Sequence, residues 1–164
     1  MLVFKALEKL KKYVDSKTLK IGLVPTMGGL HKGHLSLVEK ACSDNDLVVV
    51  SIYINPTQFN DQNDFKNYPF DLETDKTFLS SFSKNVVIYN PDNDEIYPSG
   101  IKSNSYNFGS IALHMEGKSR PGHFNGVATV IEKLIKDIKP HNAYFGEKDY
   151  QQIQIIKALN NSLK

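Results

Sequence analysis

Two histidines stand at the centre of the stretch Leu23–Leu37, which reads LVPTMGGLHKGHLSL. His31 and His34 lie three residues apart at the predicted start of a helix, so both rings could contact the same anion. Gly33 between them has no side chain to block a close approach. A turn that opens a helix also directs backbone N–H groups and the positive end of the helix dipole towards an anion. The spacing therefore predicts a site for a phosphate-bearing ligand.

The histidine pair has two alternative roles that the pattern leaves open. Both histidines could simply lie on the surface of a helix. A zinc site would need further ligands, but no third ligand has suitable spacing and Cys42 is the single cysteine. Cys42 falls near the apolar Val38 and Ala41, where we expect a small core residue. We therefore expect no resident metal ion.

The apolar pattern indicates which elements position the histidines. The run Ile21–Val24 predicts a buried strand that Pro25 ends, and apolar periodicity from Leu35 predicts a helix to about Cys42. Asp46–Ile54 reads DLVVVSIYI, a nearly continuous run rich in β-branched residues. A strand buried on both faces has this composition, which favours a parallel sheet.

The rest of the chain continues to alternate helices and strands. We expect a helix through Val3, Leu7, Leu10 and Val14, helices over Asp71–Ser83 (with Asp71 as N-cap) and Val127–Ile138, a last helix through Ile153, Ile156 and Leu159, strands over Val86–Tyr89 and Asn142–Phe145, and a turn-rich excursion with a short strand over Asp92–Gly109. This alternation predicts an α/β fold, a doubly wound Rossmann-like parallel sheet with helices on both faces, in one domain over residues 1–164.

Composition excludes several classes of partner. The 164 residues carry 20 Lys and Arg against 18 Asp and Glu, and a net charge of +2 gives no reason to expect nucleic acid or a membrane surface. The longest apolar run, Leu47–Ile54, is too short to cross a bilayer and lacks signal-peptide flanks. One cysteine cannot form an internal disulfide, which suits a reducing compartment. We expect a cytoplasmic protein.

Three polar loops follow predicted strands, at Thr26–His34, Asn55–Asn60 and Gly146–Gln152. Ligands of doubly wound sheets bind beyond the carboxyl ends of the strands. The three loops should therefore lie at one edge of the sheet and form one site.

The side chains of these loops are chemically complementary. Lys148 offers a point charge for a phosphate, and Asp149 could bind a hydroxyl or an amine. Asn55 and Gln58 offer neutral amides for a small polar substrate. Each loop taken alone could also have a purely structural role, since Asp149 could cap the last helix and Gln58 could bond only within its own loop.

Five segments together resemble the pantoate–β-alanine ligase family, along nearly the whole chain. They read VPTMGGLHKGH at 24–34, INPTQF at 54–59, EIYPSG at 95–100, EGKSRPGHFNGVATVI at 116–131 and FGEKDYQQ at 145–152. The first is also similar to the TxxxxHxGH signature of the nucleotidylyltransferase superfamily, in which a histidine pair contacts the triphosphate of ATP. The resemblance implies ATP-dependent condensation of pantoate with β-alanine to pantothenate, through a pantoyl adenylate, with release of pyrophosphate and AMP. It also implies Mg²⁺ bound with ATP, and a homodimer.

The resemblance assigns expected roles to residues of this sequence. The catalytic residues would be His34, His31 and Lys148, because imidazolium and ammonium groups stabilise charge that grows at the α-phosphorus. Gln58 and Gln152 would hold pantoate, with Asn55 and Arg120 also lining the substrate site. The residues expected to contact ATP are Met27, Gly28, Gly29, Leu30, His31, Lys32, Gly33, His34, Gly146, Glu147, Lys148 and Asp149.

The chain also departs from the family. Family members are longer and continue into a second nucleotide loop with a KMSKS-like motif and a small C-terminal lid domain, so this chain would be a truncated N-terminal domain or a natural fragment. Phe70 stands where the family commonly has a basic residue. Two other functions stay open: transfer of AMP to a phosphate acceptor, which gives no role to the NPTQF and GEKDYQQ segments, and a non-catalytic nucleotide-binding or dimerising module.

Overall fold

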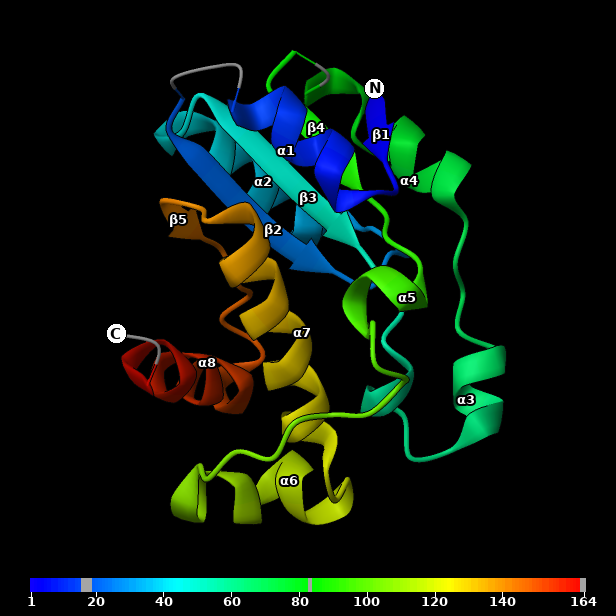
Figure 1. Cartoon of the computed structure of the whole chain (residues 1–164), viewed down its shortest axis with the longest axis vertical. Helices are drawn as coiled ribbons and strands as arrows, with labels where there is room; N and C mark the ends of the chain where they lie inside the picture. Colours follow the sequence, from blue (N-terminus) through cyan, green and yellow to red (C-terminus); the bar gives the residue numbers. More distant parts are fainter. Residues whose placement is uncertain (16–18, 83, 163–164) are drawn as a thin grey trace.

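Five parallel strands form a single sheet in the order β1-β4-β3-β2-β5 (Figure 1). The computed structural model describes residues 1–15, 19–82 and 84–162. The predicted doubly wound, Rossmann-like α/β fold is confirmed. The strands are β1 (Leu2–Phe4), β2 (Ile21–Thr26), β3 (Leu47–Ile52), β4 (Val86–Tyr89) and β5 (Asn142–Ala143).

Helices connect the strands and make up most of the remaining described chain. None of the helices within the described residues is both long and apolar enough to cross a membrane. The α-helices are α1 (Leu7–Asp15), α2 (Lys32–Asp44), α3 (Gln62–Lys66), α4 (Leu72–Phe78), α5 (Asn93–Ile96), α6 (Met115–Ser119), α7 (His123–Ile138) and α8 (Tyr150–Ser162), and the 3₁₀ turns are η1 (Pro56–Gln58), η2 (Ser80–Phe82) and η3 (Gly109–Leu113).

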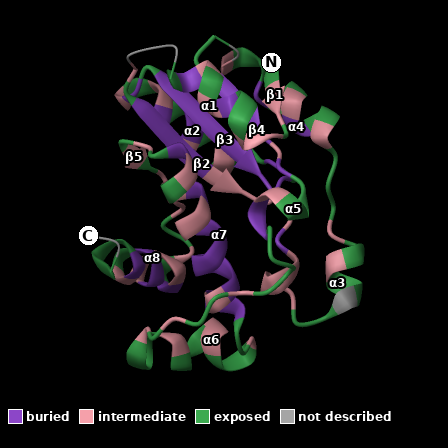
Figure 2. Cartoon of the chain, in the orientation of Figure 1, coloured by how far each residue is buried: buried purple, intermediate pink, exposed green. Residues whose placement is uncertain are grey.

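Helices cover both faces of the sheet, and every residue of β3 is therefore buried (Figure 2). On one face, Leu10 of α1 and Leu134 of α7 pack against the sheet. On the other face, Val38 and Ala41 of α2 do so. A third cluster joins the outer side of α7 to α8. This arrangement leaves the carboxyl ends of the strands as the place where polar loops can gather.

The strand order changes direction at β2. From β2 the chain steps to β3 and then to β4, whereas β5 lies on the other side of β2. The carboxyl ends of β2 and β3 are level, since Thr26 pairs with Ile52. Ligand sites of open α/β sheets form at such a change of direction. We therefore expect a ligand site at the loops after β2, β3 and β5.

The structure corrects three sequence predictions. Val3 lies in β1 and not in a helix, because residues 2–4 pair with β4 and only residues 7–15 form α1. Residues 92–109 are all described and contain no strand. There the backbone N–H of Tyr106 donates to the side chain of Asn125 on α7 instead of to a neighbouring strand. The last strand is also shorter than predicted, ending at Ala143.

Other boundaries differ by less. Asp71 caps α4 as predicted, with its carboxylate accepting from the N–H of Glu73. This helix ends at Phe78 and is followed by η2, while Ser83, the predicted helix end, lies outside the described residues. Helix α7 begins at His123, four residues before the predicted start. Residues 123–126 therefore belong to this helix.

A fully buried amide joins the loop after β3 to α7. The Asn55 side chain has no exposed surface, and its Nδ2 donates to the Gly126 carbonyl at 3.0 Å. Its Oδ1 accepts from the N–H of Thr57 at 3.2 Å and from the hydroxyl of Tyr97 at 2.6 Å. Gly126 permits the close approach, since a Cβ there would lie 2.6 Å from the Thr57 carbonyl oxygen.

We expect Asn55→Ala to lower the free energy of unfolding by about 3 kcal/mol, because it strands several buried polar groups at once. Asn60→Ala is the matched control, since Asn60 is exposed and donates one 3.3 Å hydrogen bond to the Pro121 carbonyl. The control should cost about 0.5 kcal/mol or less. Urea denaturation of both variants measures the difference, and equal losses would show that the Asn55 contacts contribute little.

Candidate active site

The turn between β2 and α2 carries the histidine pair. The Thr26 hydroxyl donates to the Ser51 carbonyl at 2.8 Å and accepts from the Gly28 N–H at 3.2 Å. Gly28 and Gly29 then adopt φ angles of +83° and +63°. Two successive residues in the left-handed region account for glycine at both positions. The turn therefore leads from the end of β2 directly into the first residues of α2.

Side chains cap the start of α2. His31 is the N-cap, and its Nδ1 accepts from the Gly33 N–H at 3.1 Å. The His34 Nδ1 accepts in return from the His31 N–H at 3.2 Å. The two rings lie with their centroids 4.1 Å apart. A Cβ at Gly33 would lie 2.9 Å from the His31 ring, so this glycine is required by the cap itself.

Five backbone amides of this turn are already used inside the protein. The N–H groups of Gly29 and Leu30 donate to the carboxylate of Asp75, and those of Gly28, His31 and Gly33 donate to side chains of the turn. The expectation that these N–H groups face an anion is thereby corrected. With these five N–H groups engaged, side-chain groups of the site become the main candidates for contacts to a negative ligand.

The hydrogen bonds also determine which ring nitrogens can donate. Because Nδ1 of both histidines accepts a backbone N–H, the proton of each neutral ring belongs on Nε2. The pair His31 and His34 thus offers two Nε2–H donors from adjacent rings. This is suitable for hydrogen bonding to a phosphate.

The charge on His34 depends on its surroundings. Burial lowers the pKa of His34 from its ordinary value of 6.5, and the positive charges of His31 and Lys148 lower it further. The carboxylates of Asp75 and Asp149 act in the opposite direction but with smaller effect. His34 is therefore a neutral hydrogen-bond donor at pH 7, where the sequence had suggested an imidazolium.

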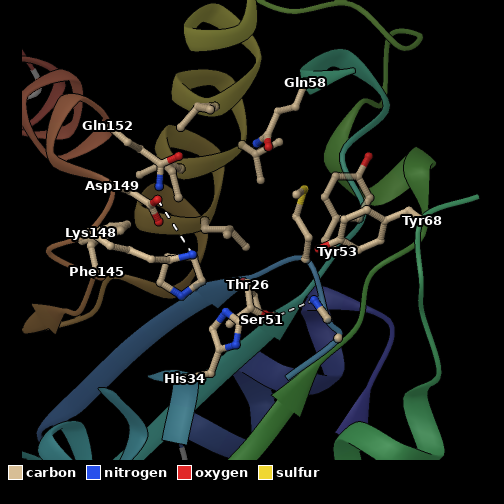
Figure 3. A pocket seen from close by; sticks show the side chains of 18 of the residues that line it. Thr26, His34, Ser51, Tyr53, Gln58, Tyr68, Phe145, Lys148, Asp149 and Gln152 are labelled. Carbon is tan, nitrogen blue, oxygen red and sulfur yellow. Dashed lines mark hydrogen bonds and ion pairs between the residues drawn. The ribbon is translucent and has the colours of Figure 1, made fainter. Parts of the chain in front are cut away.

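A cavity of about 290 Å³ opens beside the histidine pair (Figure 3). Lys148, Asp149 and Gln152 lie on one side of it, Gln58 lies opposite, and His34 lies near its base. The ammonium of Lys148 is exposed and lies 4.0 Å from the Asp149 carboxylate. The loops after β2, β3 and β5 thus contribute to one cavity, as their place in the sheet predicts. The predicted site residues that line it are Met27, Gly28, Gly29, His31, His34, Gln58, Lys148, Asp149 and Gln152.

One wall of this cavity is apolar. Helix α7 supplies four aliphatic side chains, and Tyr53 and Tyr68 add aromatic surface across from it. Burial raises the pKa of both tyrosines, so they stay protonated. The cavity can therefore enclose a ligand that has both charged and aliphatic parts. The aliphatic residues are Val127, Val130, Ile131 and Leu134.

A second cavity of about 620 Å³ adjoins the first. The two share His31, His34, Lys148, Asp149 and Gln152 among their lining residues. The predicted site residues added by the second cavity are Gly33, Gly146 and Glu147. Together the two cavities offer room for a ligand larger than either one holds.

Four predicted site residues line neither cavity. Leu30 is buried in the core, and Lys32 is exposed on the first turn of α2. Asn55 is engaged in the buried network described above. Arg120 contacts the backbone of Gln58, with its Nη2 donating to that carbonyl at 2.8 Å. Direct contact of these residues with a ligand stays a prediction.

Arg120 and His123 together hold the loop that carries Gln58. His123 Nδ1 donates to the same Gln58 carbonyl at 3.1 Å, while Arg120 Nη1 lies 3.5 Å from His123 Nε2. Burial lowers the pKa of His123, which keeps this ring neutral. Glu116 completes the group with a 3.4 Å ion pair to Arg120. The Gln58 side chain is left free of this network and lines the cavity.

Several residues at the site were not predicted from the sequence, among them Tyr53, Ser51 and Asp75. Tyr53 and Ser51 line the cavity but belong to a run that has the composition of a buried strand. Asp75 lies in an amphipathic helix, where a polar residue is ordinarily exposed. A carboxylate following the capping residue Asp71 by one turn gives no local signal of burial.

The described residues do not form a metal site of their own. Among them, no group of three or more His, Cys, Asp or Glu side chains is placed to hold a metal ion. Asp149 is the carboxylate that lines both cavities.

Comparison with known proteins identifies the family of this chain. A family model described as pantoate-beta-alanine ligase matches residues 2–164. Pantothenate synthetase of Flavobacterium psychrophilum is 45% identical over an alignment of 164 residues. The alignment covers 97% of this chain and 57% of the relative. Pantothenate synthetase of Francisella tularensis subsp. mediasiatica is 53% identical over 143 residues, which cover 87% of this chain and 54% of the relative.

A solved structure gives the same result. The crystal structure of pantoate-beta-alanine ligase from Francisella tularensis, complexed with beta-gamma ATP and beta-alanine, superposes with a TM-score of 0.93 at 47% identity. The match covers 99% of this chain and 63% of that one. The chain thus spans little more than half the length of the curated relatives it matches. The chain belongs to the pantoate-beta-alanine ligase family.

Proposed function

We propose that this chain is the ATP- and pantoate-binding domain, residues 1–164, of an ATP-dependent pantoate–β-alanine ligase. The observation that carries the proposal is the grouping of the histidine pair, Lys148 and both predicted glutamines, Gln58 and Gln152, around one cavity. Family membership and the ATP and β-alanine named for the Francisella structure support it. A cytoplasmic location and homodimeric assembly belong to the same proposal.

The proposed reaction has two steps. A carboxylate oxygen of pantoate attacks the α-phosphorus of ATP, and the bond to the β-phosphate oxygen breaks, so that pyrophosphate leaves with the electron pair. The amine of β-alanine then attacks the acyl carbon of pantoyl adenylate, loses a proton and displaces AMP. Negative charge grows on the phosphate oxygens in the first step, where hydrogen-bond donors in a partly dry site are most effective.

The side chains divide this work by their chemistry. The Nε2–H groups of His31 and His34 and the ammonium of Lys148 would bind the phosphates. The amides of Gln58 and Gln152 would bind the hydroxyl and carboxylate groups of pantoate, whose methyl groups suit the aliphatic wall of α7. Fixed groups on both sides of the cavity would hold the two reactants in line, which is a large part of the rate enhancement in such reactions.

Mg²⁺ would enter as the ATP complex. Mg²⁺ bound to nucleotides takes most of its ligands from phosphates and water and one or two from carboxylates. Asp149 fits this limited need, since it is a carboxylate that lines both cavities beside Lys148. When bound, the ion would neutralise charge on the phosphates.

The proposal is tested by supplying both substrates to this chain and measuring pyrophosphate, AMP and pantothenate separately. For residues 1–164 taken alone, which span little more than half the length of the relatives, we expect pyrophosphate release that requires pantoate, at a rate well below about 1 s⁻¹, because closure over bound substrates normally excludes water and completes a site. Hydrolysis of the exposed adenylate should make AMP exceed pantothenate.

Each other outcome identifies a different function. Transfer of AMP to a phosphate acceptor would favour a nucleotidylyltransferase, and ATP binding without pyrophosphate release would indicate a non-catalytic module. Pantothenate and AMP formed in equal amounts at about 1 s⁻¹ or faster would mean that the lid is dispensable.

In the free protein His34 should titrate below pH 6.5, because burial and two positive neighbours disfavour its charged form. Its contribution to the free energy of unfolding is therefore fully present above the unfolded-state pKa. This contribution is lost as the pH falls through the folded-state pKa, because the unfolded chain binds the proton more readily. ATP brings negative charge, so it should raise the pKa and bind more tightly as the pH is lowered through the raised value. NMR titration of the imidazole signals measures the pKa of His34 in the free protein and in the presence of ATP.

His34→Ala should abolish this pH dependence and reduce pyrophosphate release by about a hundredfold or more. His114→Ala, at an exposed histidine outside both cavities, should change neither. A free-protein titration at or above pH 6.5 would contradict the assigned environment. Unchanged pyrophosphate release in folded His34→Ala, checked by circular dichroism, would remove its catalytic role.

We also expect Gln58→Ala and Gln152→Ala each to weaken pantoate binding by roughly 1–3 kcal/mol, with ATP affinity nearly unchanged. Gln154→Ala is the matched control, because Gln154 lies two residues along α8 and does not line the cavity. Calorimetric titration with pantoate and with ATP separates the two effects. Equal weakening of both ligands, or an effect of the control as large as that of Gln152→Ala, would argue against a pantoate site here.

A further inference from the structure

Asp75 is a buried acid that contacts the histidine turn from a different helix. It belongs to α4, and only 1% of its surface is exposed. Its Oδ1 accepts from the Leu30 N–H at 2.7 Å and its Oδ2 accepts from the Gly29 N–H at 3.1 Å. Both oxygens accept, as those of an ionised carboxylate do. Hydrogen bonds of this charged kind are shorter and stronger than neutral ones.

The turn is packed closely against this carboxylate. A Cβ on Gly28 would lie 2.9 Å from Asp75 Oδ2 and 2.8 Å from the ring of Phe70. Leu30 is buried in the core, so it cannot shift freely, and the N-cap His31 follows it directly. The position of Asp75 therefore determines where the cap of α2 begins.

A negative group next to a phosphate site repels the ligand, so Asp75 must contribute something that offsets the repulsion. Burial lowers the pKa of His34 most, and His31 and Lys148 lower it further, whereas Asp75 and Asp149 raise it. Of the two acids, Asp149 is partly exposed at the cavity and Asp75 is buried under the turn. Asp75 thus provides a fixed negative charge close to His34 that acts against the causes that lower its pKa.

We propose that Asp75 is a positioning residue of the phosphate-binding turn, which holds Gly29 and Leu30 in place so that the histidine pair that follows them can contact a bound anion. The ligand part of this inference rests on the proposed ATP-binding function. The contacts to the turn and the effect on His34 do not require ATP.

Asp75→Asn tests the proposal, because the amide keeps the size of the side chain but has one acceptor oxygen and no charge. Asp71→Asn is the matched control, since Asp71 caps the same helix, is exposed and accepts its hydrogen bonds from Glu73 and Thr74 of that helix. In the ATP-free protein, the NMR titration midpoint of His34 should fall in Asp75→Asn and stay unchanged in Asp71→Asn. ATP affinity, measured by calorimetry, should fall about tenfold or more in Asp75→Asn alone.

Hydrogen exchange supplies a readout that also works on the unmodified protein. The amides of Gly29 and Leu30 should be protected from exchange in the unmodified chain and lose protection in Asp75→Asn. Exchange of both amides as fast as in an open loop would overturn the proposal even if Asp75→Asn failed to fold. If Asp75→Asn fails to fold, Asp75→Ser replaces it in the NMR titration of His34. Serine removes the charge without placing an NH₂ group against two N–H donors.

The outcomes separate this inference from the proposed function. A His34 midpoint that is the same in Asp75→Asn and Asp71→Asn would overturn the role of the charge. Absence of ATP binding in the unmodified chain would count against the proposed function, whereas protected amides and a lowered midpoint would still support Asp75 as the residue that positions the turn.

Discussion

Both faces of β3 are buried, and this constraint decides where polar chemistry can occur in the molecule. A strand enclosed by helices on two sides offers most of its polar groups at or beyond its ends, as Ser51 near the end of β3 does. Because all five strands run in parallel, the loops after β2, β3 and β5 meet at one edge. The site therefore depends on a largely apolar core for its geometry.

Local pattern predicted the parts of the fold and site that are locally determined. The histidine turn, the buried strand β3 and the amphipathic face of α7 were all visible in short stretches of sequence. Val3 was misassigned because its strand exists only through pairing with β4, more than 80 residues away by the register of Val3 with Ile88. Asp75 was missed for the same reason, since its partners Gly29 and Leu30 lie 46 and 45 residues away.

The turn shows how a motif can be located correctly while its chemistry is misjudged. Its amides looked free in the sequence, because nothing local indicates that Asp75 would accept two of them. Because these N–H groups donate to Asp75, the charged groups available to a ligand at the site are side chains. His34 is neutral in the free protein, so Lys148 is the main positive group beside the cavity before a ligand arrives.

The aliphatic wall of α7 has a consequence for attempts to change which substrates fit. Val130 and Leu134 pack into the sheet core, and Val127 and Ile131 pack against α8, yet all four also line the cavity. A smaller residue at any of these positions enlarges the cavity and also leaves a void in the core. Removal of a large aliphatic side chain commonly lowers the free energy of unfolding by about 2–5 kcal/mol. Enlarging this cavity by mutation would therefore require a compensating stabilisation elsewhere in the fold.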